Sequence, residues 1–380
     1  MDALPARLGV GFVAAWLLIG SCAGPAHVAS PSGSPGATAS PSTAPDSRAS
    51  AARTTPVTRV AGLNCTLPVA LNEPGSDEYI GMPHGGFVSF PTAALSDDPT
   101  SQLQFVGSGP GVTTVTRPHL PGQWPGPVFD RQINRWVPAR SPQVLSPDGS
   151  AYVYAAAESG GGAISPTQIR EVTVSTGGSR LLYRSGATDV PIAWTKEGIY
   201  IVAAYYEMTS NGLRLLDPRT GAVRIITRSG TWSVISGGVA WGFPPPVGLI
   251  SGFAPHTVSR LDLATGKVTT WYSVLAPKFV QVLGVDLAGR PIIAVGKSDS
   301  SGVPVAAYQI FRLVAPSASE PLFTAWPPIG YGVIWQIDAH GVWITYSDIR
   351  GQIWLYADGV GFVKVAETGK YILDIEGPCR

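Results

Sequence analysis

A repeat of about 45 residues is the feature that most limits what this chain can fold into. Three segments each read as an apolar strand, a polar turn with Thr-Gly and a second apolar strand. They span residues 169–183, 212–226 and 258–271. Their turn glycines are Gly177, Gly221 and Gly266, so the steps are 44 and 45 residues. A related hairpin turns at Asp358-Gly359, and residues 308–326 hold a weaker copy between them. Repetition at this period is typical of repeat folds.

A second hairpin precedes most of these copies, so each repeat contains four strands. The predicted hairpins lie at residues 144–154, 192–202, 282–294 and 334–344. Each has two apolar strands around a turn that carries glycine, as β-hairpins do. Four strands at this period match the blade of a β-propeller, an all-β ring of small sheets. A solenoid or a sandwich would not need four strands at so regular a step.

One turn motif supports the same fold. The segment Leu145-Ser-Pro-Asp-Gly149 resembles the turn of propeller blades in the TolB and WD40-like group. The resemblance covers the architecture of residues 141–370 and implies a propeller, but it implies no ligand. The repeats lack the Gly-His and Trp-Asp signatures of true WD40 blades.

Six blades account best for the length of the repeat region. Five full blades are predicted at residues 141–187, 188–230, 231–278, 279–326 and 327–370. The tail at 371–379 looks like the first strand of a sixth blade, and residues 127–138 look like its last two strands. Residues 86–90 should also contribute to it. The N- and C-terminal strands then share one blade and leave no free sheet edge. Seven blades are the alternative, because residues 65–140 could hold an extra one.

The first 22 residues read as an export signal. After Arg7, an uncharged run from Leu8 to Gly20 is too short for a permanent membrane span. It ends in Ile19-Gly20-Ser21-Cys22, which resembles the lipobox of bacterial lipoproteins. That resemblance implies that Cys22 is lipidated and anchors an extracytoplasmic protein to the cell membrane. An ordinary cleaved signal peptide is the alternative.

Composition separates the rest of the chain into a tether and one domain. Residues 23–60 are mainly Ala, Pro, Ser, Gly and Thr with almost no apolar bulk, so we expect a disordered tether. Residues 61–380 are expected to form the propeller domain.

Two cysteines bracket that domain. With Cys22 lipidated, Cys65 and Cys379 remain, and an oxidising compartment permits a disulfide between them. Two separate thiols are the alternative. Neither cysteine has a Cys-x-x-Cys partner and the five histidines are scattered, so no metal site is predicted.

The charge pattern narrows the class of function. Only 13% of residues are charged and the net charge is +1, which excludes a typical nucleic-acid binder. We expect a monomeric binding or protein-interaction module with a protein or glycan partner, no cofactor and no catalytic residue. The alternative is a propeller hydrolase or lyase acting on an extracellular carbohydrate or lactone. The acidic residues Asp286, Asp338 and Asp374 are unevenly spaced along the repeats. This spacing favours structural roles in turns or blades over a catalytic site. Candidate ligand contacts are His84, Trp124 and His256.

Overall fold

The fold is known from a computed structural model of the chain. It describes residues 57–72, 84–98, 112–114, 128–130, 135–137, 144–158, 167–186, 189–203, 212–244, 255–297, 308–325, 333–346, 351–368 and 371–380. Contacts divide the chain into two units, Met1–Arg53 and Thr54–Arg380, and all described residues belong to the second unit.

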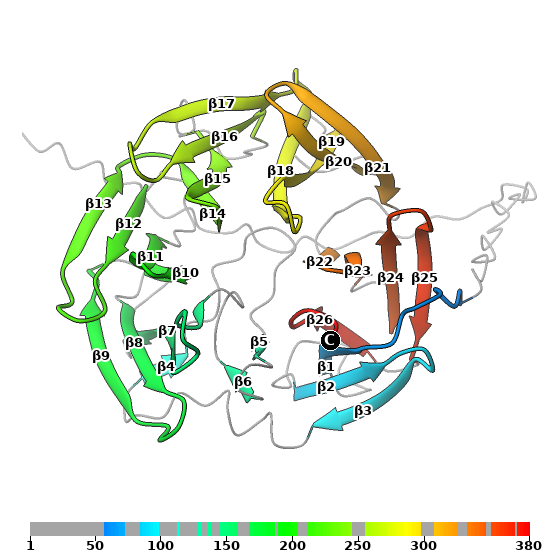
Figure 1. The fold of residues 1–380 in the computed structure, drawn as a ribbon, viewed down its shortest axis with the longest axis horizontal. Helices are drawn as coiled ribbons and strands as arrows, with labels where there is room; N and C mark the ends of the chain where they lie inside the picture. Colours follow the sequence, from blue (N-terminus) through cyan, green and yellow to red (C-terminus); the bar gives the residue numbers. More distant parts are fainter. Residues whose placement is uncertain are drawn as a thin grey trace, which may run out of the picture. The chain divides into compact units, whose positions relative to one another are not determined.

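The second unit is an all-β propeller of six four-stranded antiparallel blades (Figure 1). We call the blade that contains both chain ends the closing blade and number the others 2 to 6 along the chain. The prediction of six blades is confirmed, and the seven-blade alternative is wrong. The strands described form these six sheets and one small two-stranded sheet, with no helix among them.

Each blade has four strands that follow one another from the inner edge of the ring to its outer edge. The closing blade has β26 (Tyr371–Ile375), β1 (Thr66–Asn72), β2 (His84–Ser89) and β3 (Ala94–Asp98). Blade 2 has β4 (Val112–Thr114), β7 (Ala151–Glu158), β8 (Thr167–Thr173) and β9 (Ser179–Arg184). Blade 3 has β10 (Asp189–Thr195), β11 (Gly198–Ala203), β12 (Leu213–Leu216) and β13 (Val223–Thr227).

The remaining blades follow the same order. Blade 4 has β14 (Thr231–Ser236), β15 (Val239–Phe243), β16 (Thr257–Asp262) and β17 (Val268–Ser273). Blade 5 has β18 (Lys278–Val285), β19 (Pro291–Lys297), β20 (Tyr308–Ala315) and β21 (Ala318–Ala325). Blade 6 has β22 (Val333–Asp338), β23 (Gly341–Tyr346), β24 (Gln352–Ala357) and β25 (Gly361–Glu367). The separate sheet pairs β5 (Val128–Asp130) with β6 (Arg135–Val137).

The repeated Thr-Gly turns have the same backbone conformation. Gly177, Gly221 and Gly266 have φ angles of 68°, 73° and 72°, in the left-handed region that glycine adopts without steric cost. Each of their N–H groups donates to the carbonyl four residues earlier, at 2.8 to 2.9 Å. The sequence repeat is therefore a repeat of backbone geometry.

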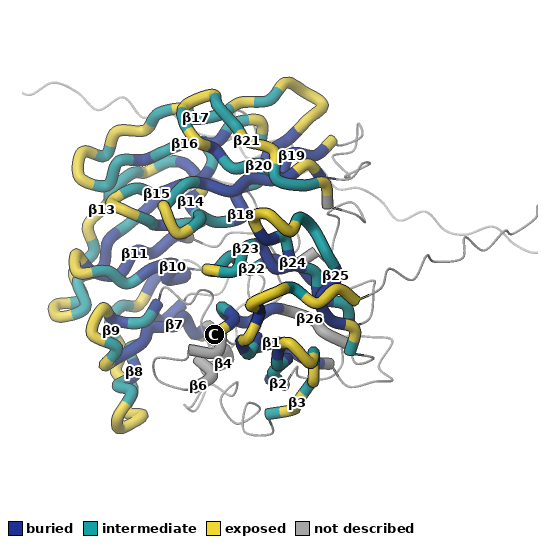
Figure 2. Tube along the Cα trace, turned by 45° about the vertical axis from the view of Figure 1, so that its right-hand side comes forward, coloured by how far each residue is buried: buried dark blue, intermediate teal, exposed yellow. Residues whose placement is uncertain are grey.

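Burial follows the position of a strand in its blade (Figure 2). The first six residues of β19 are all buried, whereas the outer strands β13 and β17 contain no buried residue. β19 is the second strand of its blade and has neighbouring blades close to both of its faces, which explains why it reads as an apolar run rather than an alternating one.

Tryptophans on the strands pack between blades. Trp241, Trp335 and Trp343 are 3%, 8% and 0% exposed. Trp335 Nε1 donates to the carbonyl of Leu283 in the preceding blade at 2.9 Å. A buried indole therefore satisfies its polar atom while it joins two blades.

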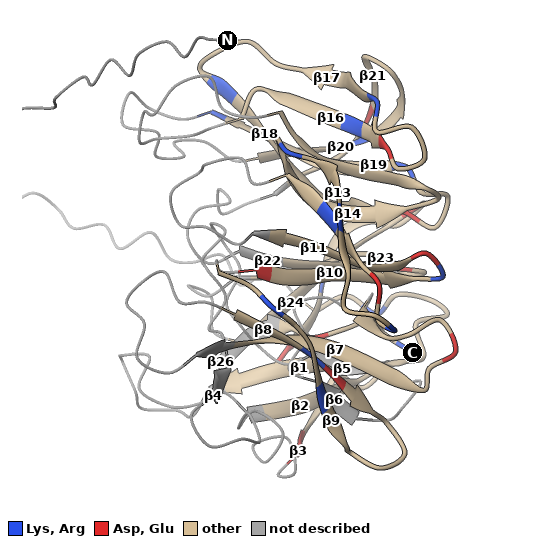
Figure 3. Ribbon diagram, turned by 90° about the vertical axis from the view of Figure 1, so that its left-hand side faces the viewer, with Lys and Arg blue, Asp and Glu red and all other residues tan. Residues whose placement is uncertain are grey.

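Charged residues are spread over several blades (Figure 3), and one ion pair joins two neighbouring blades. Arg312 on β20 lies 3.3 Å from Asp286 in its own blade and 3.3 Å from Asp358 in blade 6. Its side chain is 12% exposed. An arginine fork that meets carboxylates from two blades fixes how the blades sit together.

The two ends of the chain build the closing blade together, as predicted. The inner strand β26 pairs antiparallel with β1, with Val69 opposite Ile375 and Asn72 opposite Tyr371. The pairing continues to the end of the chain, because Thr66 and Arg380 exchange backbone hydrogen bonds of 2.9 and 3.2 Å. The predicted contribution of residues 86–90 is confirmed, since they lie in and next to β2.

The outer half of the closing blade differs from the prediction. Residues 127–138 were expected to supply its last two strands, but β5 and β6 within that range pair only with each other among the described strands. The last two strands are instead β2 and β3. The hairpin signal was correct, but a local pattern cannot say which sheet a hairpin joins.

Blade 2 also begins earlier than predicted. Its inner position is held first by β4, where Thr113 lies opposite Ala157, and then by an isolated bridge from Leu145 to Tyr152. The chain thus leaves the inner position after Thr114 and returns near Leu145. The prediction that this blade starts at residue 141 missed β4 because a three-residue strand carries almost no pattern.

The predicted disulfide is present. Cys65 and Cys379 are joined across a sequence separation of 314 residues, with Cα atoms 5.5 Å apart. They are 6% and 2% exposed. The bond links the segment before β1 to the segment after β26, so it ties the two paired ends covalently.

Replacing Cys65 and Cys379 together by serine should lower the free energy of unfolding. Loop-closure entropy sets an upper figure of about 5 kcal/mol for so long a loop. Denaturant unfolding monitored by tryptophan fluorescence measures the loss. The matched control is Cys22→Ser, the same exchange outside the domain, which should leave the free energy of unfolding unchanged. Equal stability of the double variant and the control would contradict the prediction.

Candidate functional site

Within blades 3 to 6, the connections at one face of the ring are shorter than those at the other. In blades 3 to 6 the turns between first and second strands lie at one face, together with all six turns between third and fourth strands. These turns contain two to six residues, and we call this the turn face. The connections between second and third strands leave from the opposite face, which we call the loop face, and contain five to thirteen residues. Variable length on a regular scaffold is typical of a binding face.

Acidic residues on the turn face are used within their own turns. Asp148 accepts hydrogen bonds from the Ser146 hydroxyl at 2.7 Å and from the Ser150 hydroxyl and N–H at 2.8 and 3.0 Å. The Ser146 hydroxyl has the largest effect in lowering the pKa of Asp148 to about 2. Asp262 accepts from the N–H and hydroxyl of Thr265, which lower its pKa too. These carboxylates stabilise turns, so their position does not indicate catalysis.

Asp338 joins the tail of the chain to blade 6. It ends β22, and its side chain is 4% exposed. Its Oδ2 atom accepts hydrogen bonds from the N–H of Cys379 at 2.7 Å and from Trp343 Nε1 at 2.8 Å. Its Oδ1 atom accepts the N–H of His340 at 2.7 Å. Three donors on one nearly buried carboxylate hold the last residues of the chain against blade 6.

An aromatic pair packs the closing blade against the same part of blade 6. The rings of Phe90 and Trp343 have centroids 5.4 Å apart, and the two residues are 6% and 0% exposed. The N–H of Phe90 donates to the carbonyl of Cys65 at 2.8 Å. The disulfide, Asp338 and this pair therefore form one seam between the first and last parts of the chain.

Residues 57–65 form a lead-in segment that passes blade 6 before it enters β1 (Figure 1). The N–H of Thr58 donates to the carbonyl of Lys364 on β25 at 2.7 Å. The Lys364 side chain is 1% exposed and binds Glu367 at 2.6 Å, which holds the pKa of Glu367 below its usual range. Residues 57–60, predicted as the end of the tether, thus contact the propeller.

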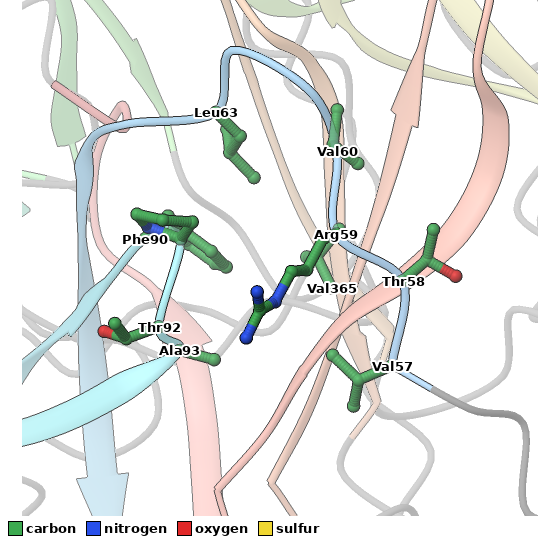
Figure 4. Close-up of a pocket in the computed structure, with 10 residues that line it drawn as sticks. Val57, Thr58, Arg59, Val60, Leu63, Phe90, Thr92, Ala93 and Val365 are labelled. Atoms are coloured by element: carbon green, nitrogen blue, oxygen red, sulfur yellow. The ribbon is translucent and has the colours of Figure 1, made fainter.

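A cavity of about 250 Å³ lies where the lead-in segment, the turn between β2 and β3, and β25 meet (Figure 4). We call it the seam pocket. Its lining residues are Val57, Thr58, Arg59, Val60, Leu63, Phe90, Pro91, Thr92, Ala93 and Val365. Arg59 is the one charged side chain among them, and it points toward Phe90 and Ala93. The pocket combines apolar walls with a single guanidinium.

The predicted ligand contacts do not come together. His84 is the first residue of β2, at the loop face of the closing blade. His256 immediately precedes β16, at the loop face of blade 4, which lies opposite in the ring. The His256 ring Nδ1 meets the carbonyl of Lys278 at the start of blade 5, so the ring ties two blades. Trp124 and Cys22 lie outside the described residues.

The three acidic residues considered in the sequence analysis lie apart, on different blades. Asp286 follows the inner strand β18 and Asp338 ends the inner strand β22, both at the turn face, while Asp374 lies within β26. Within the described ranges, no group of three or more His, Cys, Asp or Glu side chains could hold a metal ion. Nor do those ranges contain a helix long and apolar enough to cross a membrane.

Sequence reasoning missed Arg59 and the role of Asp338. Arg59 stood in the expected tether, and only the pairing of Thr58 with β25 places it in a pocket. The partners of Asp338 include Cys379, which is 41 residues away, so no local pattern could reveal them.

No family model and no curated protein matches the chain. Solved structures do resemble it. TolB from Acinetobacter baumannii is 13% identical with a TM-score of 0.46, covering 83% of this chain and 67% of that chain. An oligogalacturonate lyase in complex with manganese is 11% identical with a TM-score of 0.39, covering 75% and 83%. A candidate 6-phosphogluconolactonase from Bacteroides fragilis is 10% identical with a TM-score of 0.45, covering 82% and 96%. TM-scores below 0.5 support no conclusion about ligand or activity.

Replacing Asp338 by alanine should destabilise the protein by about 3 kcal/mol. The change leaves the indole N–H of Trp343 and the backbone N–H of Cys379 without an acceptor. Each unpaired buried donor costs roughly 1–3 kcal/mol. Denaturant unfolding measures the loss. Asp148→Ala is the control, because Asp148 also lies at the turn face but is exposed and serves only its own turn. A loss at Asp338 no greater than at Asp148 would disprove the bridging role.

Proposed function

We propose that this protein is an extracytoplasmic binding module whose propeller contacts a protein or glycan partner through its loop face. A lipid on Cys22 holds it at the cell membrane, and residues 23–60 serve mainly as a tether. The observation that carries the proposal is the difference between the two faces: five to thirteen residues in the second-to-third connections against two to six in the turns.

The loop-face connections also have the composition of a contact surface. The second-to-third connections include Tyr79, Tyr205 and Tyr206, and the link from β21 to β22 at the same face includes Trp326 and Tyr331. Tyrosine and tryptophan are enriched at protein interfaces, because they offer a large apolar area together with one polar atom. On the turn face, the carboxylates of Asp148 and Asp262 bond within their own turns.

The hydrolase or lyase alternative has less support. Catalysis on a carbohydrate needs carboxylates free to exchange protons or to bind a metal. Asp286 accepts the N–H groups of Ala288 and Arg290 at 3.0 and 2.9 Å. Asp338 is committed to the seam. Both carboxylates stabilise the fold on the turn face, so they favour binding over catalysis.

Replacing Cys22 by serine should release the protein from membranes. A lipobox cysteine provides the thiol that receives the lipid, and serine cannot replace it. Fractionation of cells that produce the full-length chain measures the distribution, with Ser30→Ala in the tether as the control. A Cys22→Ser variant that sediments with membranes as the control does would refute the lipid anchor.

Site-specific photo-crosslinking tests which face meets the partner. Leu275 and Leu287 are 86% and 81% exposed and flank the same strand, β18, at opposite faces of the ring. A benzophenone amino acid at Leu275, on the loop face, should crosslink the protein or glycan partner in intact cells. The same probe at Leu287, on the turn face, should yield little. Adducts mainly at Leu287 would overturn the proposal.

A further inference from the structure

The seam pocket lies away from the loop face. Phe90 and Ala93 belong to the turn between β2 and β3, which is part of the turn face, and Val365 lies on β25. The pocket is therefore distinct from the surface to which the proposed function assigns the partner. A ligand there would contact the lead-in segment, the closing blade and blade 6 at once.

The floor of the pocket is apolar and already formed. Leu63, Phe90 and Val365 are 5%, 6% and 3% exposed, so contacts within the fold hold these side chains in place. Phe90 is fixed by its ring contact with Trp343, and Leu63 by a 3.2 Å hydrogen bond from its N–H to the carbonyl of Val60. A preformed apolar floor needs little reorganisation on binding, which favours affinity for a small ligand.

Arg59 is the charged group of the pocket, and none of the described side chains neutralises it. Arg180, Arg214 and Arg312 each bind a carboxylate. Arg59 makes no such contact, while its guanidinium points into the cavity (Figure 4). A planar guanidinium with free donors matches a carboxylate through two parallel hydrogen bonds.

The size and walls of the cavity limit the ligand further. An apolar cavity of about 150 Å³ holds a benzene ring. At about 250 Å³, the seam pocket has room for one such group and a carboxylate. Inorganic phosphate would satisfy the arginine but would leave the apolar floor uncovered.

We propose that the seam pocket binds a carboxylate attached to one aromatic or branched apolar group. Arg59 binds the carboxylate, and Leu63, Phe90 and Val365 receive the apolar group. The same chemistry occurs in a free organic acid and in the C-terminal residue of a peptide, and the two sources can be told apart by experiment.

The test uses the purified full-length chain and NMR titration with methyl-labelled leucine and valine. The probes are benzoate, isovalerate, a short peptide ending in phenylalanine, the same peptide with a C-terminal amide, and inorganic phosphate. Benzoate, isovalerate or the free-acid peptide should shift the methyl signals of Leu63 and Val365 saturably. Binding by the acids alone identifies a small organic acid, and binding by the peptide alone identifies a chain terminus. The amide and phosphate should bind at least tenfold more weakly.

Arg59→Gln should weaken binding of the preferred probe at least tenfold and leave the thermal unfolding midpoint unchanged, since Arg59 is exposed and unpaired. Arg228→Gln is the matched control, because it removes the same charge from an exposed arginine on blade 3 and should change affinity less than twofold. Equal affinity in the two variants would overturn the proposal. The proposal would also be overturned if no probe shifted the signals of Leu63 and Val365 saturably, or if the amide peptide or phosphate bound as tightly as the preferred probe.

Discussion

The pairing of β26 with β1 is the constraint on which the rest of the structure depends. Each blade packs against two neighbours, so an open ring would expose two apolar blade faces and one unpaired strand edge. The chain avoids this by building one blade from both of its ends. Backbone hydrogen bonds, the disulfide between Cys65 and Cys379, and the carboxylate of Asp338 all act at this one junction.

Closure also decides where binding surfaces can form. Because the strands alternate in direction, the turns between third and fourth strands lie at one face and the longer connections between second and third strands at the other, and the longer connections vary most in length. The seam adds a second kind of surface. The lead-in segment crosses from β25 to β1, and the space beneath it is lined by residues from the beginning and the end of the chain.

The sequence predicted features that repeat and missed those that occur once. The repeat period and the Thr-Gly turns were visible because they recur along the chain. The number of blades followed from the length of the repeat region, and the disulfide from the number of cysteines. The three-residue strand β4 was missed, and the hairpin β5–β6 was assigned to the wrong sheet, because pairing between distant segments leaves no local pattern. Arg59 and Asp338 gain their roles from contacts that only the closed ring creates.

Hydrogen–deuterium exchange of β26 tests most directly whether the shared blade holds the ring closed. In the oxidised protein, the paired amides of β26 should exchange as slowly as those of β19, which lies inside blade 5. After reduction of the disulfide they should become the first strand amides to exchange, ahead of β19. If the β26 amides of the oxidised protein exchange as fast as those of an exposed turn, the two chain ends do not close the ring.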